Sequence, residues 1–130
     1  MRLLLDTHVL IWAVSRPERL EARIRAALAA PGTTAFVSAV SAWEIAIKRA
    51  LGRLGFPLED FDRVLDEAGL EHLPVLAAHG IEAGSLPRHH GDPFDRMLIA
   101  QARVEDLVLV SEDVALAAYD VWLCGREAMR

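Results

Sequence analysis

Apolar residues occur along the chain in two patterns, short continuous runs and longer segments with helical spacing. The continuous runs, with two weaker segments, predict buried strands at 2–5, 34–40, 70–75, 107–111 and 121–123. The helically spaced segments predict helices at 8–14, 17–30, 42–54, 57–69, 76–86 and 93–104. Apolar strands that alternate with helices are typical of a parallel sheet covered on both faces. We therefore expect an α/β fold, an α/β/α sandwich with a central parallel sheet.

The length and composition fit one domain spanning residues 1–130. With 53% hydrophobic residues, the chain can build one substantial core. Its longest uncharged stretch, 26–43, is interrupted by Pro31 and Gly32 before it reaches a membrane-spanning length. Asp6 interrupts the apolar N-terminal segment where a signal peptide would need to stay hydrophobic. We expect a cytoplasmic protein without membrane association.

Four carboxylates fall at related places in these predicted elements. Asp6 directly follows the first strand, and Asp113 follows the strand near the end of the chain. Glu44 and Asp95 each lie in the first turn of a predicted helix, and Glu44 comes soon after a strand. Open parallel sheets bind ligands at the carboxyl ends of their strands. We therefore expect these four side chains to converge at one edge of the sheet.

Helix capping is an alternative explanation for each acid taken singly. Ser41 and Glu44 have the spacing of a capping box, and Asp92 precedes a proline as an N-cap would. Asp6 and Asp113 could cap the helices that follow them. Capping alone does not require acids at all these places, because serine, threonine or asparagine would serve.

Carboxylates that cluster repel each other, and a divalent cation would offset that repulsion. Sites made only of oxygen ligands suit Mg²⁺ or Mn²⁺, which also bind phosphate groups. This combination favours metal-assisted phosphodiester hydrolysis. The net charge of −5 argues against a nucleic-acid binder with a basic surface, but two bound divalent ions would change it to about −1.

Further polar residues adjoin the acids. Thr7 and Ser111 could orient carboxylates or a bound water, or could make only local turn bonds. Lys48 lies on the same helix face as Glu44 and could pair with it or contact a phosphate. Arg96 follows the acid of the last helix and could also contact RNA. For both basic residues we favour an ordinary solvated charge.

The adjacent histidines His89 and His90 raise the alternative of a zinc site with Asp92. Neighbouring residues on a loop lack the spacing of a helical zinc pair, and no cysteine or third histidine lies close in sequence. We therefore interpret these two residues as loop histidines that contact RNA.

Four segments together resemble the successive blocks of PIN-domain ribonucleases, most closely the toxins of VapBC toxin–antitoxin pairs. They are LLLDTHVLIWA, VSAVSAWEIAIK, LPRHHGDPFDRMLIAQA and LVLVSEDVAL. The resemblance implies a PIN-like α/β/α domain with an Mg²⁺- or Mn²⁺-dependent endoribonuclease site. By position in the blocks, the four acids of the family correspond to Asp6, Glu44, Asp95 and Asp113. Asp92 matches an acid common in this subgroup, and Glu112 is the alternative to its neighbour for the fourth position.

The resemblance also implies partners. Such toxins cleave RNA, are bound by a cognate small antitoxin protein and commonly form homodimers. Apolar surface for the antitoxin could come from Trp12 and Val14 with the predicted helix 17–30, and from the predicted helix 57–69. Taken singly, we favour a place in the core for each of these apolar residues.

Two other function classes remain open. A phosphoacceptor domain with an acidic pocket also binds Mg²⁺, but its paired acids after the first strand and its lysine after a late strand are missing here. A non-catalytic module of the same fold that binds RNA or protein would not need the complete set of acids. A metal-dependent nuclease assay separates these classes.

Overall fold

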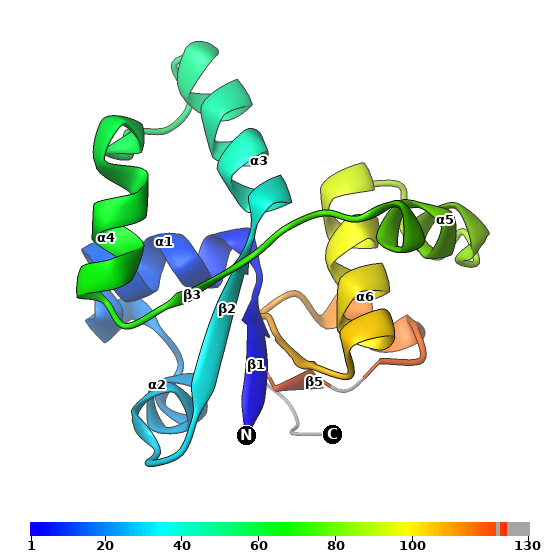
Figure 1. The fold of residues 1–130 in the computed structure, drawn as a ribbon, viewed down its shortest axis with the longest axis horizontal. Helices are drawn as coiled ribbons and strands as arrows, with labels where there is room; N and C mark the ends of the chain where they lie inside the picture. Colours follow the sequence, from blue (N-terminus) through cyan, green and yellow to red (C-terminus); the bar gives the residue numbers. More distant parts are fainter. Residues whose placement is uncertain (122, 125–130) are drawn as a thin grey trace.

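The computed structural model describes residues 1–121 and 123–124. Five strands form one sheet in the order β3-β2-β1-β4-β5, and every neighbouring pair is parallel. The strands are β1 (Arg2–Leu5), β2 (Thr34–Ser38), β3 (Glu71–Leu73), β4 (Val108–Val110) and β5 (Leu123–Cys124). The sheet lies between two layers of helices, which confirms the predicted α/β/α sandwich (Figure 1).

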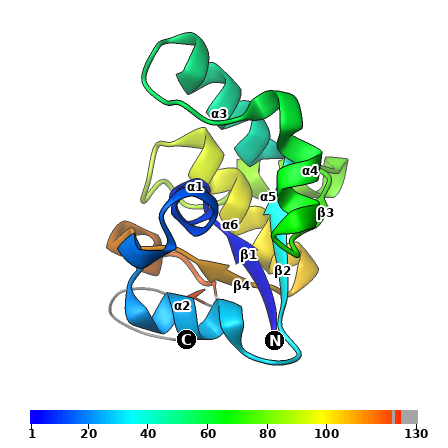
Figure 2. The same ribbon diagram turned by 90° about the vertical axis from the view of Figure 1, so that its left-hand side faces the viewer.

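Helices cover both faces of the sheet. The α-helices are α1 (Thr7–Ser15), α2 (Ala22–Ala29), α3 (Ala39–Ala50), α4 (Phe61–Glu67), α5 (Ala77–Ser85) and α6 (Pro93–Glu105). Short 3₁₀ helices are η1 (Pro17–Arg19), η2 (Leu58–Asp60) and η3 (Val114–Ala118). Helices α1, α2 and α4 lie on one side of the sheet and α5 and α6 on the other, as Figures 1 and 2 show.

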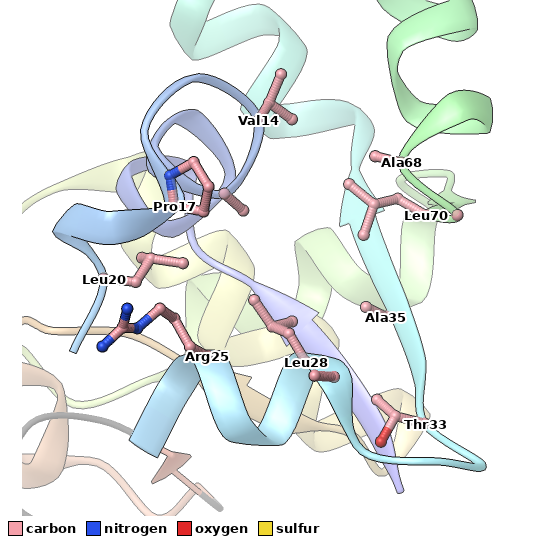
Figure 3. A pocket seen from close by; sticks show the side chains of 12 residues that line it. Val14, Pro17, Leu20, Arg25, Leu28, Thr33, Ala35, Ala68 and Leu70 are labelled. Carbon is pink, nitrogen blue, oxygen red and sulfur yellow. The ribbon is translucent and has the colours of Figure 1, made fainter. Parts of the chain in front are cut away.

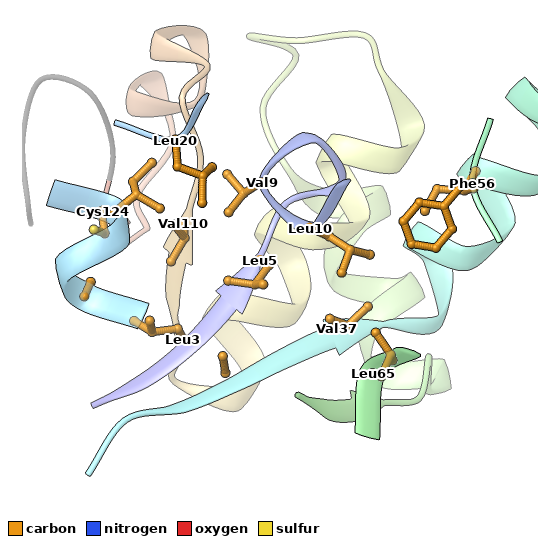
Figure 4. Packing of buried hydrophobic residues seen from close by; sticks show 14 residues of the cluster. Leu3, Leu5, Val9, Leu10, Leu20, Val37, Phe56, Leu65, Val110 and Cys124 are labelled. Atoms are coloured by element: carbon orange, nitrogen blue, oxygen red, sulfur yellow. The ribbon is translucent and has the colours of Figure 1, made fainter. Parts of the chain in front are cut away.

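Successive leucines of β1 enter two separate cores. Leu3 and Leu5 pack with residues of α1, α2 and α4 on one face (Figure 4). Leu4 points to the opposite face and packs with residues of α6. Successive side chains of a strand point to opposite faces, so a strand buried on both sides is apolar throughout.

The chain changes direction across the sheet between β1 and β4. It runs from β1 to β2 and β3 on one side, and then to β4 and β5 on the other. Such a switch point forms the ligand-binding crevice of open parallel sheets. The backbone N–H of Asp6 donates to the carbonyl of Val110 at 2.9 Å, which joins the residue after β1 to the end of β4.

The predicted strand 34–40 is too long. It ends at Ser38, whose hydroxyl accepts a hydrogen bond from the backbone N–H of Val40 at 3.0 Å and caps α3. Helix α3 therefore begins at Ala39, three residues before the predicted start. As a result, Glu44 lies in the second turn and not in the first, and it forms no capping box with Ser41.

The predicted helix 17–30 is divided into η1 and α2. Leu20 and Glu21 between them have extended backbone, with ψ of 144° and 142°. Leu20 is only 4% exposed and fills the core, and the N–H of Glu21 donates to a carboxylate oxygen of Glu112 at 3.1 Å. The carboxylate of Glu112 thus gives the N–H of Glu21 an acceptor outside the helix, and the burial of Leu20 stabilises the extended segment.

The remaining elements differ from the prediction mainly in length. The helix predicted at 57–69 is η2 followed by α4, and the strand predicted at 70–75 is the three-residue β3. Residue 122 of the predicted strand 121–123 lies outside the described residues, and β5 covers Leu123–Cys124. Among the described helices, none is long and apolar enough to cross a bilayer.

Candidate active site

Asp6 is a buried carboxylate at the switch point of the sheet. It follows β1, caps α1 and is 5% exposed. Its Oδ1 accepts the N–H of Val9 at 2.9 Å, and its Oδ2 accepts the hydroxyl of Ser111 at 2.5 Å. Burial raises the pKa of Asp6, while the hydrogen bonds from Ser111 and Val9 act in the opposite direction. Asp6 is thus both a helix cap and part of a charged cluster.

Glu44 extends from α3 into the same edge of the sheet and is buried. Its Oε1 accepts the hydroxyl of Thr7 at 2.6 Å, and its Oε2 lies 2.6 Å from Nζ of Lys48. The hydroxyl of Thr7 also lies 3.0 Å from that of Ser41. Because a carboxylate only accepts, the single proton of Thr7 goes to Glu44 and Ser41 donates to Thr7. The negative charge of Glu44 also raises the pKa of Asp6.

Asp92 and Asp95 have different roles at the start of α6. Asp92 is the N-cap, and its Oδ1 accepts the N–H groups of Phe94 at 2.8 Å and Asp95 at 3.2 Å. The side chain of Asp95 instead contacts His90, whose Nε2 lies 2.7 Å from its Oδ2. Burial raises the pKa of Asp95 to about 6, and the charges of Asp92 and Asp6 act in the same direction.

Two adjacent acids after β4 point to different parts of the molecule. Asp113 is exposed and caps η3 by accepting the N–H of Ala115 at 3.0 Å. Potential ligand atoms of His90, Asp95 and Asp113 all lie within 4.8 Å of one another. Glu112 instead accepts the N–H of Glu21 beside α2.

The four predicted acids form a connected group at the carboxyl edge of the sheet. Asp6 is coupled electrostatically to Glu44 on one side and to Asp95 on the other, and Asp95 lies beside Asp113. Like charges repel each other at short range, so a cation among these acids would stabilise their ionised forms. Carboxylate oxygens are the donors that Mg²⁺ and Mn²⁺ prefer, so these residues fit a divalent ion.

The basic residues predicted beside the acids are held by the protein itself. Lys48 pairs with Glu44, one of the two alternatives that its spacing allowed. The expectation of a solvated charge is wrong for Arg96, because its guanidinium is half-buried and occupied by hydrogen bonds. It donates to the carbonyl oxygens of Ala83, Leu86 and Pro87 at 3.0, 3.0 and 2.9 Å. Arg96 thus fastens the loop before α6 to the end of α5.

The two loop histidines differ in their surroundings. His90 lies within the acidic cluster, whereas His89 is exposed and packs edge-on against Tyr119 with ring centroids 5.1 Å apart. The hydroxyl of Tyr119 accepts the backbone N–H of His90 at 2.8 Å. Sequence reasoning missed Tyr119, because no local pattern connects two residues that lie 29 positions apart.

Comparisons with known proteins identify the family from the sequence and the fold from solved structures. The family model of the PIN domain matches residues 3–121. No curated protein matches the chain in sequence. Among solved structures, a chain of VapBC2 from Rickettsia felis, bound to a DNA fragment from its promoter, superposes with a TM-score of 0.71 at 17% identity, covering 96% of this chain and 98% of that chain.

Two further structures have similar coverage. A chain of DNA-bound VapBC from Salmonella typhimurium has a TM-score of 0.66 at 16% identity, over 96% of this chain and 98% of that chain. A chain of VapBC-5 from Mycobacterium tuberculosis, of a toxin–antitoxin family, has a TM-score of 0.61 at 18% identity, over 98% of both chains. At these identities the likeness is one of fold.

Proposed function

Because the chain belongs to the PIN domain family, we propose that it is an endoribonuclease that depends on Mg²⁺ or Mn²⁺ and hydrolyses phosphodiester bonds of RNA. The observation that carries this proposal is the convergence of four acids from separate segments, Asp6, Glu44, Asp95 and Asp113, at the switch point of the sheet. Capping accounts for Asp6 and Asp113 locally, but it does not account for the mutual approach of the carboxylates.

In this proposal the four acids hold the ion or ions. A divalent ion held by these residues would supply the activation of a water molecule and the stabilisation of negative charge on the departing oxygen. The hydroxyl of Ser111 fixes one oxygen of Asp6, and that of Thr7 fixes one oxygen of Glu44. These hydrogen bonds orient the carboxylates in advance, as outer partners of metal ligands do.

We propose further that the protein is the toxin of a toxin–antitoxin module and binds a cognate small antitoxin protein. Its fold likeness to chains of VapBC structures supports this, and so does a groove of about 380 Å³ beside α1, α2 and the end of α4 (Figure 3). Apolar residues of the groove include Val14, Leu20, Leu28 and Leu70. The groove overlaps the predicted partner surface at Val14, within 17–30 and at 68–69. Trp12 does not line the groove, because its ring lies 5.0 Å from the guanidinium of Arg19.

We also propose that the protein forms a homodimer. Trp43 and Ile47 on α3 and its C-cap residue Leu51 recur every four residues, and all three are exposed. Trp43 packs edge-on against Phe94 at the start of α6, with ring centroids 5.2 Å apart. An exposed apolar stripe of this kind is typical of a surface that binds another protein.

The test of the nuclease proposal is RNA cleavage by the purified protein with Mg²⁺, with Mn²⁺ and with excess EDTA. We expect cleavage with either ion and none in EDTA, because the carboxylates cannot activate water without a cation. Undiminished cleavage in excess chelator would contradict the proposal. RNA binding without cleavage under any of these conditions would instead favour a non-catalytic module.

Two neighbouring acids provide matched variants for the same assay. Asp92→Ser keeps a residue that caps α6, so we expect near-normal thermal stability and substantial activity. Asp95→Ser should abolish cleavage while the protein stays folded, because it removes one charge from a repulsive cluster. If both variants were equally inactive at equal thermal stability, Asp92 would also be a ligand.

A further inference from the structure

His90 brings a nitrogen atom into the group of carboxylates at the start of α6. Its Nε2 is 2.7 Å from Oδ2 of Asp95, and one potential ligand atom from each of His90, Asp95 and Asp113 lies within 4.8 Å of the other two. Ligand atoms about 2.1 Å from one ion are about 3 Å apart when adjacent and about 4 Å apart when opposite. The three side chains are therefore spaced for a shared cation, with only small movements.

The backbone of His90 is fixed from two sides. Its N–H donates to the hydroxyl of Tyr119 at 2.8 Å, and its carbonyl accepts from that hydroxyl at 3.3 Å and from Arg96 at 3.4 Å. Arg96 in turn is bound to carbonyls at the end of α5. A ligand held on a fixed backbone loses little conformational entropy when it binds an ion.

The neighbouring histidine shows that this placement is specific to one residue. His89 is exposed, and among the described interactions it makes only a T-shaped ring contact with Tyr119. It is not part of the group formed by His90, Asp95 and Asp113. The two adjacent imidazoles therefore form a natural pair of test and control.

We propose that His90 is a nitrogen ligand of the bound ion and makes the site favour Mn²⁺ over Mg²⁺. This inference rests on the proposed metal dependence and adds a ligand to the four acids. Mg²⁺ takes oxygen ligands almost exclusively, whereas divalent transition ions bind imidazole more readily. Replacing the imidazole should thus weaken Mn²⁺ binding more than Mg²⁺ binding.

The experiment measures metal binding without any RNA. Mn²⁺ is titrated by electron paramagnetic resonance, Mg²⁺ is added as competitor, and the ¹⁴N couplings of bound Mn²⁺ report a coordinated imidazole. For His90→Ala we expect at least about tenfold weaker Mn²⁺ binding, a smaller loss for Mg²⁺ and no ¹⁴N coupling. His89→Ala should behave like the wild type in all three measurements.

A second variant separates ligation from positioning. His90→Gln retains a hydrogen-bond donor for Asp95 but offers no imidazole nitrogen, and its folding can be checked by circular dichroism. Loss of the ¹⁴N coupling in folded His90→Gln supports ligation. Equal weakening of Mn²⁺ and Mg²⁺ in His90→Ala, or no ¹⁴N coupling in the wild type, would overturn it.

The outcomes also distinguish this inference from the proposed function. A wild-type protein that shows the ¹⁴N coupling but cleaves no RNA would support the ligand and contradict the nuclease. Cleavage with Mn²⁺ bound through oxygen alone would overturn the ligand and leave the nuclease intact. A wild-type protein that binds neither ion would contradict both.

Discussion

At the scale of single residues, the four acids occupy unequal environments. Asp6 and Glu44 are buried, and each is fixed by at least one hydroxyl or backbone donor. Asp95 is half-buried and Asp113 is exposed. The buried pair is thus the part of the cluster that the fold orients most strictly, and the loss of Asp113 should disturb the fold least.

The raised pKa of Asp95 predicts a pH dependence of stability. Burial raises this pKa to about 6, so between roughly pH 4 and 6 the folded chain holds a proton that the unfolded chain has released. The free energy of unfolding therefore falls as the pH rises through that window, and the raised pKa of Asp6 acts in the same direction. When the pH is raised from about 5 to 7 in EDTA, the midpoint of thermal unfolding should fall less for Asp95→Asn than for the wild type.

Calorimetry or circular dichroism can measure the midpoints of thermal unfolding, and the same measurement with added Mn²⁺ is the control. A bound cation stabilises the ionised carboxylates, so it should raise the midpoint of the wild type mainly at the higher pH. An equal pH effect in wild type and Asp95→Asn would show that this carboxyl does not carry a raised pKa.

At the scale of elements, the junction between α2 and the end of β4 is held by one acid. Glu112 accepts the N–H of Glu21, 91 residues away, where the chain leaves its extended segment and enters α2. Its neighbour Asp113 faces His90 and Asp95. Of these two consecutive acids, Glu112 therefore contacts the start of α2, whereas Asp113 belongs to the acidic cluster.

Variants at these two positions should separate stability from metal binding. Glu112→Ala should lower the free energy of unfolding by about 1 kcal/mol, because a backbone N–H loses its charged acceptor, and should leave Mn²⁺ affinity unchanged. Asp113→Asn retains a cap for η3 and should weaken Mn²⁺ binding at near-normal stability. Denaturant unfolding and Mn²⁺ titration measure the two effects. Equal loss of Mn²⁺ affinity in both variants would make Glu112 a ligand as well.

The sequence predicted the sheet and the placement of the acids because both leave local signals. Continuous apolar runs mark the strands, and Asp6 and Asp113 follow such runs directly. Their position at a shared edge then follows from parallel topology alone. The same rule predicts Glu44 at that edge. The structure places it there, although its helix begins three residues earlier than predicted.

Features that depend on long-range contacts could not be predicted in this way. The break at Leu20 follows from a core position and from Glu112, neither of which alters the helical periodicity of 17–30. Arg96 resembles a surface charge in sequence, but its acceptors are carbonyls that become available only where α5 ends. Tyr119 likewise reaches His90 only through the folded chain.

At the scale of the whole molecule, the acidic cluster and the apolar groove are separate surfaces. None of the four acids lines the groove, which lies on the side of the sheet covered by α1, α2 and α4. A partner that inhibits the site from the groove must therefore be extended. An amphipathic segment could lay its apolar side in the groove and carry an Arg or Lys to the carboxylates.

Because the groove and the acidic cluster are separate, a change in the groove should abolish inhibition by the partner without loss of RNA cleavage. Expression of the protein alone should slow growth of the host, and co-expression of its small protein partner should relieve the effect. Ala29→Glu places a charge at the exposed rim of the groove and should abolish relief while RNA cleavage persists. Ala26→Glu, exposed on the same helix but outside the groove lining, is the matched control.

Growth curves and cleavage assays with both variants measure these effects. Harmless expression of a protein that cleaves RNA in vitro would contradict the assignment as a toxin and leave the nuclease intact. Relief that survives Ala29→Glu would exclude this groove as the docking surface.

The hydrogen bond from Ser111 to Asp6 joins two residues that are 105 positions apart. The carboxylate after the first strand therefore receives its orienting hydroxyl only after residue 111 has been synthesised. During translation, a nascent chain whose segment around Ser111 is still inside the ribosome carries Asp6 and Glu44 without Ser111 and Asp113. The order of synthesis thus delays assembly of the cluster until most of the polypeptide exists.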